Sequence, residues 1–472
     1  MNNVRPQLNL LNEDQIQQVH QYALRILSET GARVDSPSVI ELLKKTGQVQ
    51  VQERSVKFSP EIVEQSIQSA PPVIPMYDRL GNPAFRLGDD RLRFGVGVTA
   101  LYYQEPINDN LELFSRRHMR IMTQLGSSLP HYDVISTPGI VQDVPKSLGD
   151  LFGNLEMLVS TTKPLVVLTS DANKLSPLIS MFEYLHGELG EKPFVMPYFN
   201  PVSPLVMDSG TLLKMRVAID HGLPFIFSNY SLAGASTPLT AAGTLVLLLA
   251  ELLAGLTISQ VMKPGTPISV GMLPAYLDMK AMVNFYDSQS VLLNIACAEI
   301  MAHYKLPHCG TSCSGMGWGM DLITADLYWM NALTFALTRG GLAPFIGDSL
   351  GSKSISPCTV VHAHEIIDQA FRFANGFQLD DTQAVLDEIA KVGPGGSFLS
   401  SPSTLKNFKT GYYSSPLYPR FSMEKWQAAG QPEARQVLRE KTQALLKQLS
   451  APEDGEALLR KGEEYIKLLQ FQ

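Results

Sequence analysis

Residues 303–321 read HYKLPHCGTSCSGMGWGMD. An apolar segment precedes this stretch, the stretch itself is rich in glycine, and a helical pattern begins after Asp321. In a chain of alternating strands and helices, this order marks the end of a strand and a loop that carries function. Glycine in such a loop permits unusual backbone angles and the close approach of a ligand. A loop that merely packs buried cysteines and one tryptophan is the structural alternative.

Short apolar runs alternate with helical patterns on both sides of this stretch, and several begin directly after proline, which a strand tolerates at its first residue. We interpret eight runs as strands: Leu92–Tyr103, Asp133–Ile140, Leu165–Thr169, Phe194–Phe199, Phe225–Tyr230, Ile268–Met272, His308–Ser312 and Phe345–Ser349. Eight strand–helix units over about 270 residues predict an α/β fold, a (β/α)8 TIM barrel. A doubly wound open sheet is the alternative. The chain has no early G-x-G-x-x-G and no P-loop lysine, which disfavours its nucleotide-binding versions.

Extensions are expected on both sides of the barrel. We predict a helical N-terminal extension over residues 1–90, the barrel over 91–360, and a helical C-terminal extension packed on the barrel over 361–472. The first helix should start after Leu11, with Asn12 and Gln15 forming a capping box, and should end at Gly31.

Composition excludes several classes of function. The chain has 472 residues, a net charge of −7, no basic block and four cysteines. Nucleic acid is therefore not expected as a partner, nor is a disulfide framework. The N-terminus lacks an apolar signal core. The apolar run 244–261 is interrupted by Glu251, so we interpret it as a helix buried beneath the C-terminal extension or in a homo-oligomer interface. We expect a cytoplasmic homo-oligomer without a membrane span.

The side chains at the predicted C-terminal strand ends are aromatic and neutral-polar, with few charges. In a barrel enzyme the chemistry lies at these ends. Rings around a site suit an apolar ligand or a quaternary ammonium, which binds to ring faces. Tyrosines that only cap the barrel core are the structural alternative. The candidates for an ammonium cage are Tyr102, Tyr103, Tyr198, Phe199, Tyr230 and Trp318.

A zinc site is an alternative use of the histidines and cysteines in this stretch. His303, His308, Cys309 and Cys313 lie close together in the sequence, and zinc favours such ligands. However, His303 falls on the helix before the strand, and neighbouring strand residues point to opposite faces. We therefore expect no metal bound by this chain. A zinc-dependent barrel hydrolase or methyltransferase that uses Cys309, Cys313 and His308 stays open as an alternative function.

Three segments resemble the trimethylamine methyltransferase family: Ile26–Val34 (ILSETGARV), Leu306-Pro307 with the following Gly-Thr-Ser loop, and Val392–Leu399 (VGPGGSFL). Founding members carry pyrrolysine, and this chain has only standard residues, so it resembles the pyrrolysine-free branch. The resemblance implies transfer of a methyl group from a quaternary amine, such as glycine betaine, to the Co(I) of a cobalamin-type corrinoid in a separate cognate protein. Many members carry histidine where this chain has Ser397, and a second one near Ser403.

The chemistry of a quaternary nitrogen agrees with this implication. Such a nitrogen departs as a neutral tertiary amine and needs no acid, and the partner's Co(I) is the nucleophile. We therefore expect an enzyme, a corrinoid-dependent methyltransferase, that orients the methyl group and excludes water without a catalytic residue of its own. Asp321 or Asp348 would add negative potential near the cation. Asn200, Asn229, Thr311 and Ser312 would bond a substrate carboxylate, and Lys353 would pair with it. Each acid has a helix cap as its structural alternative. A non-catalytic quaternary-amine binding protein is the second alternative function.

Overall fold

The protein is described from a computed structural model that covers residues 3–89, 91–311, 313–338, 341–379 and 384–469. Eight parallel strands close into a barrel, with the last pairing with the first. In chain order these strands are β7 (Arg93–Val96), β10 (Val134–Ser136), β11 (Leu165–Val167), β12 (Val195–Phe199), β14 (Phe225–Ala233), β15 (Ile268–Asp278), β17 (His308–Cys309) and β18 (Leu342–Ile346). The predicted TIM barrel is confirmed.

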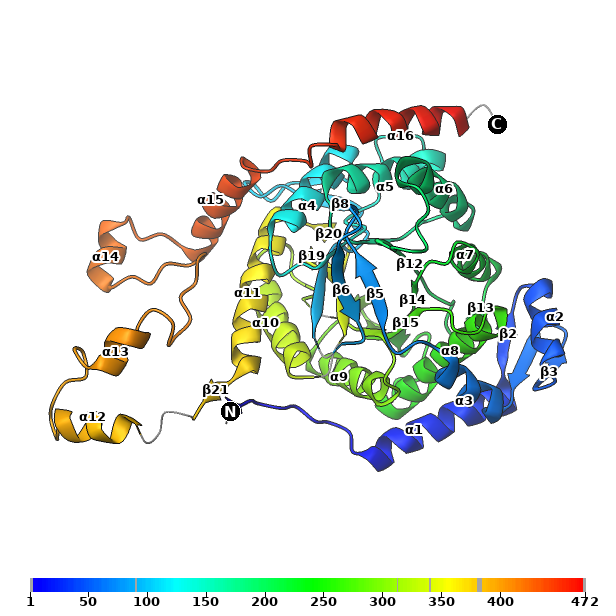
Figure 1. Ribbon diagram of the computed structural model, residues 1–472, viewed down its shortest axis with the longest axis horizontal. Coiled ribbons are helices and arrows are strands. Elements are labelled where there is room, and N and C mark those ends of the chain that lie inside the picture. Colours follow the sequence, from blue (N-terminus) through cyan, green and yellow to red (C-terminus); the bar gives the residue numbers. More distant parts are fainter. Residues whose placement is uncertain (1–2, 90, 312, 339–340, 380–383, 470–472) are drawn as a thin grey trace.

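Eight helices surround the strands (Figure 1), each following one strand along the chain. They are α4 (Arg116–Ser128), α5 (Gly149–Ser160), α6 (Leu175–His186), α7 (Ser209–Asp220), α8 (Ala241–Met262), α9 (Ser288–His303), α10 (Leu322–Leu337) and α11 (Pro357–Asn375). The last of these ends at Asn375, so the barrel domain extends beyond the expected boundary at residue 360.

The ends of several barrel strands differ from the expectation, and the first and eighth strands matter most for the site. The first is only Arg93–Val96, because the chain leaves the barrel at Gly97, whose φ is +132°. The eighth is Leu342–Ile346, which starts before Pro344 and ends before Gly347. Asp348 therefore belongs to the C-terminal mouth of the barrel and not to the strand itself.

A hairpin closes the N-terminal end of the barrel. Strands β5 (Ile74–Tyr77) and β6 (Pro83–Leu87) lie across this end in Figure 1. Ile74, Met76 and Leu87 are buried against the inward-facing side chains of the barrel strands. Apolar contact with the hairpin removes these strand ends from water. The opposite, C-terminal end is the one available for a ligand.

The N-terminal extension combines helices and strands. Asn12 and Gln15 form the predicted capping box at the start of α1 (Glu13–Arg25), and the helical stretch ends at Gly31, whose φ is +80°. Helices α2 (Pro37–Lys45) and α3 (Pro60–Ser69) follow. A small sheet joins β2 (Ala32–Val34), β3 (Val49–Gln52), β4 (Ser55–Phe58) and the barrel-loop strand β13 (Val206–Met207). The extension is thus not purely helical, in contrast to the expectation.

The apolar helix α8 is covered by this extension. By length and composition, α8 is the one helix among the described segments that is apolar enough to cross a membrane, but 72% of its apolar window is buried inside the protein. Helices α1, α2 and α3 pack on it (Figure 1). The predicted burial of α8 is therefore observed, but its cover is the N-terminal extension rather than the C-terminal one.

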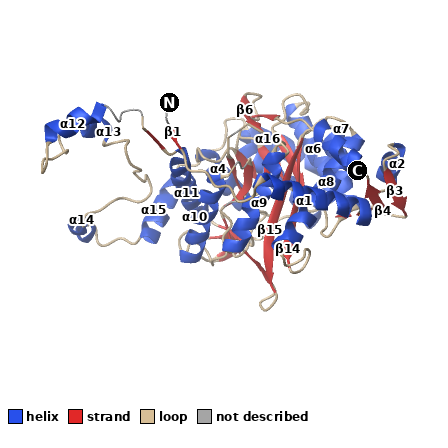
Figure 2. Ribbon diagram, turned by 90° about the horizontal axis from the view of Figure 1, so that it is seen from below, coloured by secondary structure: helices blue, strands red, loops and turns tan. Residues whose placement is uncertain are grey.

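The C-terminal region has two parts. Helices α15 (Ala434–Leu446) and α16 (Gly455–Leu469) pack on the barrel helices, the former on α11 and the latter on α5 and α6. Arg79 of the closing hairpin pairs bidentately with Asp454, at 2.6 Å for both contacts. Between α11 and α15, helices α12 (Ala384–Val392), α13 (Pro402–Asn407) and α14 (Met423–Ala428) extend away from the barrel (Figures 1 and 2). Only part of this extension is therefore packed on the barrel.

Candidate functional site

Strands β14 and β15 shape the C-terminal mouth. Both continue past the barrel, and β16 (Val283–Phe285) returns antiparallel to β15. Figure 2 shows this ribbon projecting on the side opposite to β6. A second small sheet at the mouth contains β8 (Tyr102–Gln104), β9 (Leu111–Leu113), β19 (Asp348–Ser349) and β20 (Ser354–Ile355).

Three tyrosines meet near one buried carboxylate at this mouth; we call Tyr198, Tyr230, Tyr286 and Asp348 the ring cluster. The hydroxyls of Tyr230 and Tyr286 are hydrogen-bonded to each other. Asn284 Nδ2 donates to the Tyr230 hydroxyl at 3.0 Å. Burial raises the pKa of both tyrosines, and the nearby Asp348 raises it further. Tyr198 also raises the pKa of Tyr286, which connects the third tyrosine to this group through Tyr286.

Asp348 is the charged member of the ring cluster. Its side chain is fully buried, at 0% exposure. Its Oδ2 accepts a hydrogen bond from Ser352 Oγ at 2.8 Å, and its Oδ1 accepts one from the Gly315 amide at 3.3 Å. Burial raises the pKa of Asp348 to about 7, although these hydrogen bonds favour the ionised form. Burial thus disfavours the ionised form of Asp348, and a bound cation would favour the carboxylate.

The glycine-rich loop after β17 holds Asp348 by close backbone contact. A Cβ at Gly315 would lie 2.7 Å from the Asp348 carbonyl oxygen and 3.1 Å from the ring of Tyr328. The Tyr328 hydroxyl donates to that same carbonyl. At Gly317, a Cβ would lie 2.0 Å from Asp321 Oδ1. Glycine is thus needed at both positions, because any side chain would collide with Asp348 or Asp321. The glycine-rich stretch thereby allows the loop to pack closely against these two residues.

Tyr198 lies at the base of the ring cluster. Its ring contacts Phe345 of β18 edge to face, with centroids 4.9 Å apart and planes at 82°. Tyr198 is 6% exposed, and burial raises its pKa. Two rings from strands on different sides of the barrel therefore close its interior below the mouth.

Several predicted site residues have other neighbours. Tyr103 is buried and stacks on His118, with centroids 4.1 Å apart. Phe199 stacks on Phe225 at 4.9 Å, because it follows Tyr198 on the strand and faces the opposite way. Asn229 is tied to α8: its Nδ2 donates to the Leu248 carbonyl at 2.7 Å and to Glu251 Oε2 at 3.0 Å. These three side chains pack against partners outside the barrel interior and do not join the ring cluster.

The remaining predicted residues lie around the rim. Asp321 caps α10, since its Oδ1 accepts from the Thr324 amide at 2.9 Å. The Trp318 side chain is 75% exposed, and Asn200 and Lys353 are exposed as well. Tyr102 is half-buried in β8, and the Thr311 backbone is held by Asn294. Ser312 lies outside the described residues.

Tyr286 and Asn284 were missed by the sequence reasoning. The expected strand stopped at Met272, whereas β15 continues to Asp278 and the chain returns along β16 to bring both side chains back. The signal was present: the apolar pattern continues through Leu273 and Leu277, and the aromatic pair Phe285-Tyr286 follows the turn.

The cysteine- and histidine-rich stretch does not converge on a metal. Cys309 faces the barrel interior, whereas Cys313 Sγ contacts the Tyr328 carbonyl of α10. His308 Nδ1 contacts the Leu306 carbonyl, and His303 faces Glu13 of α1. Across the described segments, no three His, Cys, Asp or Glu side chains lie together in a way that would hold a metal ion.

A hollow of about 200 Å3 lies at the ends of the first three barrel strands, and no residue of the ring cluster lines it. Thr99, Thr137, Thr169 and Asp150 are among its lining residues, and no aromatic ring lines it. This hollow lacks the ring faces that hold a quaternary ammonium. The ring cluster is therefore the better candidate site for a cation.

Comparisons with known proteins agree with this architecture. The chain is 26% identical over 444 residues to a glycine betaine methyltransferase of Desulfitobacterium hafniense (strain Y51), covering 90% of each chain. It is 23% identical to the trimethylamine methyltransferase MttB of Methanosarcina barkeri, covering 93% of this chain and 91% of the relative. The crystal structure of the Methanosarcina barkeri monomethylamine methyltransferase (MtmB) superposes with a TM-score of 0.53 at 10% identity, covering 94% and 89%. The family model for trimethylamine methyltransferase (MTTB) matches residues 1–468, and the chain belongs to this family.

Proposed function

We propose that this protein transfers a methyl group from a quaternary amine to the corrinoid of a separate protein. Glycine betaine is the leading substrate, and dimethylglycine is the product. The observation that carries the proposal is the ring cluster: three tyrosines and one buried carboxylate at the mouth of the barrel. Similarity to a glycine betaine methyltransferase supports the choice of substrate.

The ring cluster suits a quaternary ammonium for two reasons. The faces of Tyr198, Tyr230 and Tyr286 attract a cation through the ring quadrupole. Asp348 adds a negative charge in a buried place, where its potential is screened less than at the surface. Together they hold the nitrogen and fix the direction of its methyl groups.

The leaving group explains why the ring cluster needs no general acid. When the methyl–nitrogen bond breaks, its electron pair stays on nitrogen, and dimethylglycine leaves as a neutral tertiary amine. The work of the chain is to orient one methyl group toward the mouth and to exclude water from it. We therefore assign no nucleophile and no acid–base residue to this chain.

The corrinoid partner is proposed to dock on the mouth, where it supplies the Co(I) that accepts the methyl group. A large macrocycle and its protein need an apolar surface with exposed side chains. The rim carries such side chains, each at least 43% exposed: Leu101, Leu113, Met279, Met282, Trp318 and Leu322. Trp318 thus changes from a proposed member of the cage to a proposed contact for the partner.

The substrate carboxylate would be held at the rim. Lys353 lies in the turn between the paired strands β19, which carries Asp348, and β20. Its exposed ammonium offers a point charge that can reach a carboxylate extending out of the ring cluster. Thr311 and Asn200 are the polar side chains left for additional hydrogen bonds, because Asn229 is already bonded to α8.

A methyl-transfer assay tests the proposal. Purified protein is mixed with chemically reduced cob(I)alamin, or with a reduced corrinoid protein, and a panel of quaternary and tertiary amines. We expect the methylated corrinoid to form with a quaternary amine and not with its tertiary product. Ligand binding without transfer to any corrinoid would instead favour a quaternary-amine binding protein.

A further inference from the structure

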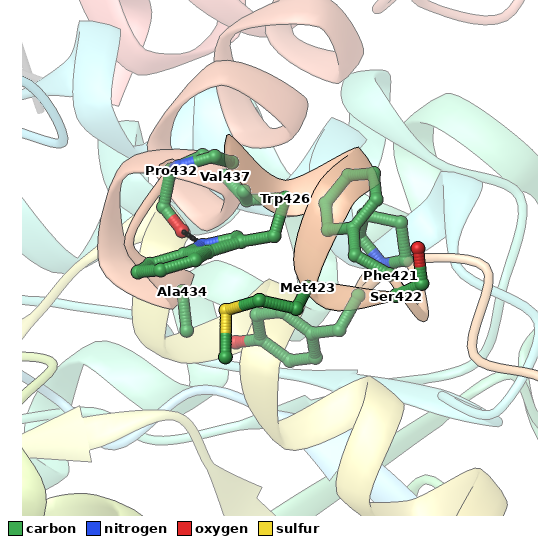
Figure 3. Close-up of a pocket in the computed structure, with 9 residues that line it drawn as sticks. Phe421, Ser422, Met423, Trp426, Pro432, Ala434 and Val437 are labelled. Carbon is green, nitrogen blue, oxygen red and sulfur yellow. Dashed lines mark hydrogen bonds between the residues drawn. The ribbon is translucent and has the colours of Figure 1, made fainter. Parts of the chain in front are cut away.

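Trp318 is the most exposed of the three tryptophans, with 75% of its side chain in contact with water. Trp426, by comparison, lines an apolar pocket between α14 and α15 (Figure 3), and its Nε1 donates to the Pro432 carbonyl at 3.2 Å. Single apolar residues are often exposed on protein surfaces, so the exposure gains meaning only from the way the Trp318 backbone is held.

Both polar groups of the Trp318 backbone are bound by side chains. The Trp318 amide donates to Asp321 Oδ2 at 2.8 Å, and the other carboxylate oxygen of Asp321 caps α10. The Trp318 carbonyl accepts a hydrogen bond from Gln104 Nε2 of β8 at 3.0 Å. We call residues 315–321 the Trp318 loop. Two elements that are far apart in the sequence, β8 and α10, thus fix the backbone that carries the exposed indole.

Gln104 is the buried side chain that makes the longer of these connections. It is 3% exposed, and its Nε2 donates to the Asp109 carbonyl at 3.2 Å as well as to the Trp318 carbonyl. A Cβ at Gly319 would lie 2.7 Å from Gln104 Oε1, so the Trp318 loop contacts the amide closely. Because a buried carbonyl without a donor is costly, one amide that serves two carbonyls fixes their relative position.

Asp109 extends the connection to the C-terminal region. Its carbonyl accepts from Gln104, and its carboxylate pairs with Arg435 and Arg439 of α15. Helix α15 itself packs on the barrel helix α11. The Trp318 loop is therefore connected, through Gln104 and Asp109, to a helix that is fixed on the barrel.

The Trp318 loop also packs against the hairpin that carries Asp348. The Leu350 amide donates to the Gly317 carbonyl at 2.9 Å, and the Gly351 amide donates to the Gly315 carbonyl at 3.1 Å. The Gly315 amide in turn donates to Asp348 Oδ1. One loop thus carries both the exposed indole and a hydrogen bond to the ring cluster, so a molecule that docks on the indole lies beside the mouth.

We propose that Trp318 is the main contact for the corrinoid-carrying partner and that Gln104 is the positioning residue for it. This inference rests on the proposed function, which brings that partner to the mouth. Leu322 and Ile323 follow at the start of α10, are 85% and 47% exposed, and enlarge the apolar surface that begins with Trp318. Tryptophan often contributes most to the binding free energy of an interface, and a backbone that is already fixed lowers the entropy lost on docking.

Methyl transfer to two different acceptors separates docking from chemistry. Free cob(I)alamin needs only the mouth, whereas a corrinoid protein that accepts methyl groups from other enzymes of this family also needs the docking surface. Trp318→Ala should raise the KM for the corrinoid protein at least about tenfold more than it changes the rate with free cob(I)alamin. Equal losses with the two acceptors would overturn the proposed contact.

Gln104→Met keeps the length of the side chain and removes its hydrogen-bond donor. We expect the KM for the corrinoid protein to rise about 2- to 10-fold, with kcat at saturation nearly unchanged. Because Gln104 acts through Trp318, Gln104→Met should add nothing to Trp318→Ala in the double variant. The matched control, Gln436→Met, removes an exposed glutamine from α15 and should leave the KM unchanged. Additive effects of the two substitutions would overturn the role of Gln104.

Hydrogen–deuterium exchange follows the Trp318 loop in the protein alone. In Gln104→Met the amides of residues 317–320 should exchange faster than in the wild type, and in Gln436→Met they should not. Asp109→Asn weakens the pairing with Arg435 and Arg439 and should act in the same direction; it replaces Gln104→Met if circular dichroism shows that variant to be unfolded. Unchanged exchange would overturn the positioning role. A wild type that transfers to neither acceptor would instead overturn the proposed function.

Discussion

The rings of Tyr198 and Phe345 meet edge to face, 4.9 Å between centroids, although they belong to the fourth and eighth strands of the barrel. An edge-to-face pair of this kind stabilises by about 0.5–1.5 kcal/mol beyond its buried area. The contact closes the interior of the barrel below the mouth. In the proposed function, this ring pair forms the floor beneath the site that Tyr198, Tyr230, Tyr286 and Asp348 would provide for the ammonium group.

The charge of Asp348 should matter for cationic ligands only. Asp348→Asn keeps the shape of the side chain and removes the charge, so we expect the Kd for glycine betaine to rise roughly 10- to 100-fold. Isothermal titration calorimetry measures this change. The neutral isostere 3,3-dimethylbutyrate, in which carbon replaces the nitrogen, is the control. An equal loss of affinity for both ligands would mean that the substitution disturbs the mouth and not the charge.

Affinity for a quaternary amine should rise with pH. Burial raises the pKa of Asp348 to about 7, and the ligand binds better to the carboxylate than to the acid. Affinity should therefore increase as pH rises through 7 and level off above it, with a proton released on binding at lower pH. Calorimetry in buffers of different ionisation enthalpy counts this proton. The Asp348→Asn variant should show neither effect; a pH profile shared by both proteins would assign the titration to another group.

The free energy of unfolding of the ligand-free protein should fall as pH rises, whereas the affinity for a quaternary amine should increase. The pKa of Asp348 is higher in the folded chain than the usual value near 3.9 of an unfolded one. The folded state then binds more protons between about pH 4 and pH 7, and the free energy of unfolding falls as pH rises across this window. Chemical denaturation at several pH values measures the slope. Asp348→Asn should make this slope less negative, and an unchanged slope would contradict the assignment.

Tyr286 should act through its ring rather than its hydroxyl. Tyr286→Phe keeps the ring face and loses the hydrogen bond to the Tyr230 hydroxyl. That hydroxyl still accepts a hydrogen bond from Asn284 Nδ2 at 3.0 Å, so the affinity should change little. Tyr286→Leu removes the ring, and we expect affinity for a quaternary amine to fall roughly 2- to 30-fold. Comparable losses in the two variants would show that hydrogen bonding, and not the ring, holds the ligand.

Lys353 should distinguish substrates with and without a carboxylate. Because the Lys353 side chain is exposed, Lys353→Ala should weaken the binding of glycine betaine only roughly 1.5- to 5-fold. Affinity for tetramethylammonium, which has no carboxylate, should not change. Equal changes for the two ligands would remove Lys353 from the substrate site.

The barrel was predictable because its signals repeat along the chain. Short apolar runs after proline and the Asn12–Gln15 capping box identify elements from local sequence alone, and the structure has them where they were expected. Strand limits were less predictable. The eighth run was expected to begin at Phe345, directly after Pro344, because a proline normally starts a strand or stands at its edge, whereas β18 begins three residues earlier, at Leu342.

The candidate site was predictable only in part. Which strand side chains point into the barrel depends on three-dimensional geometry that the sequence of one chain does not contain. Tyr198 and Phe199 are neighbours on β12, so only one of them can face the interior, and both had been proposed. Asn229 was expected near a strand end, but β14 continues to Ala233, and the Asn229 side chain bonds to Glu251 of the following helix, α8. Tyr286 reaches the mouth through the return of β16, which lies beyond the expected end of the sixth strand.

Transfer of a labelled methyl group tests the central claim most directly. Glycine betaine with 13C in its methyl groups is incubated with the protein and a reduced corrinoid, and both products are followed by nuclear magnetic resonance. The account predicts equal amounts of labelled dimethylglycine and labelled methyl-corrinoid, and a strong reduction of both in the Asp348→Asn variant. Binding of glycine betaine without any transferred label, with a corrinoid protein that accepts methyl groups from other enzymes of this family, would contradict it.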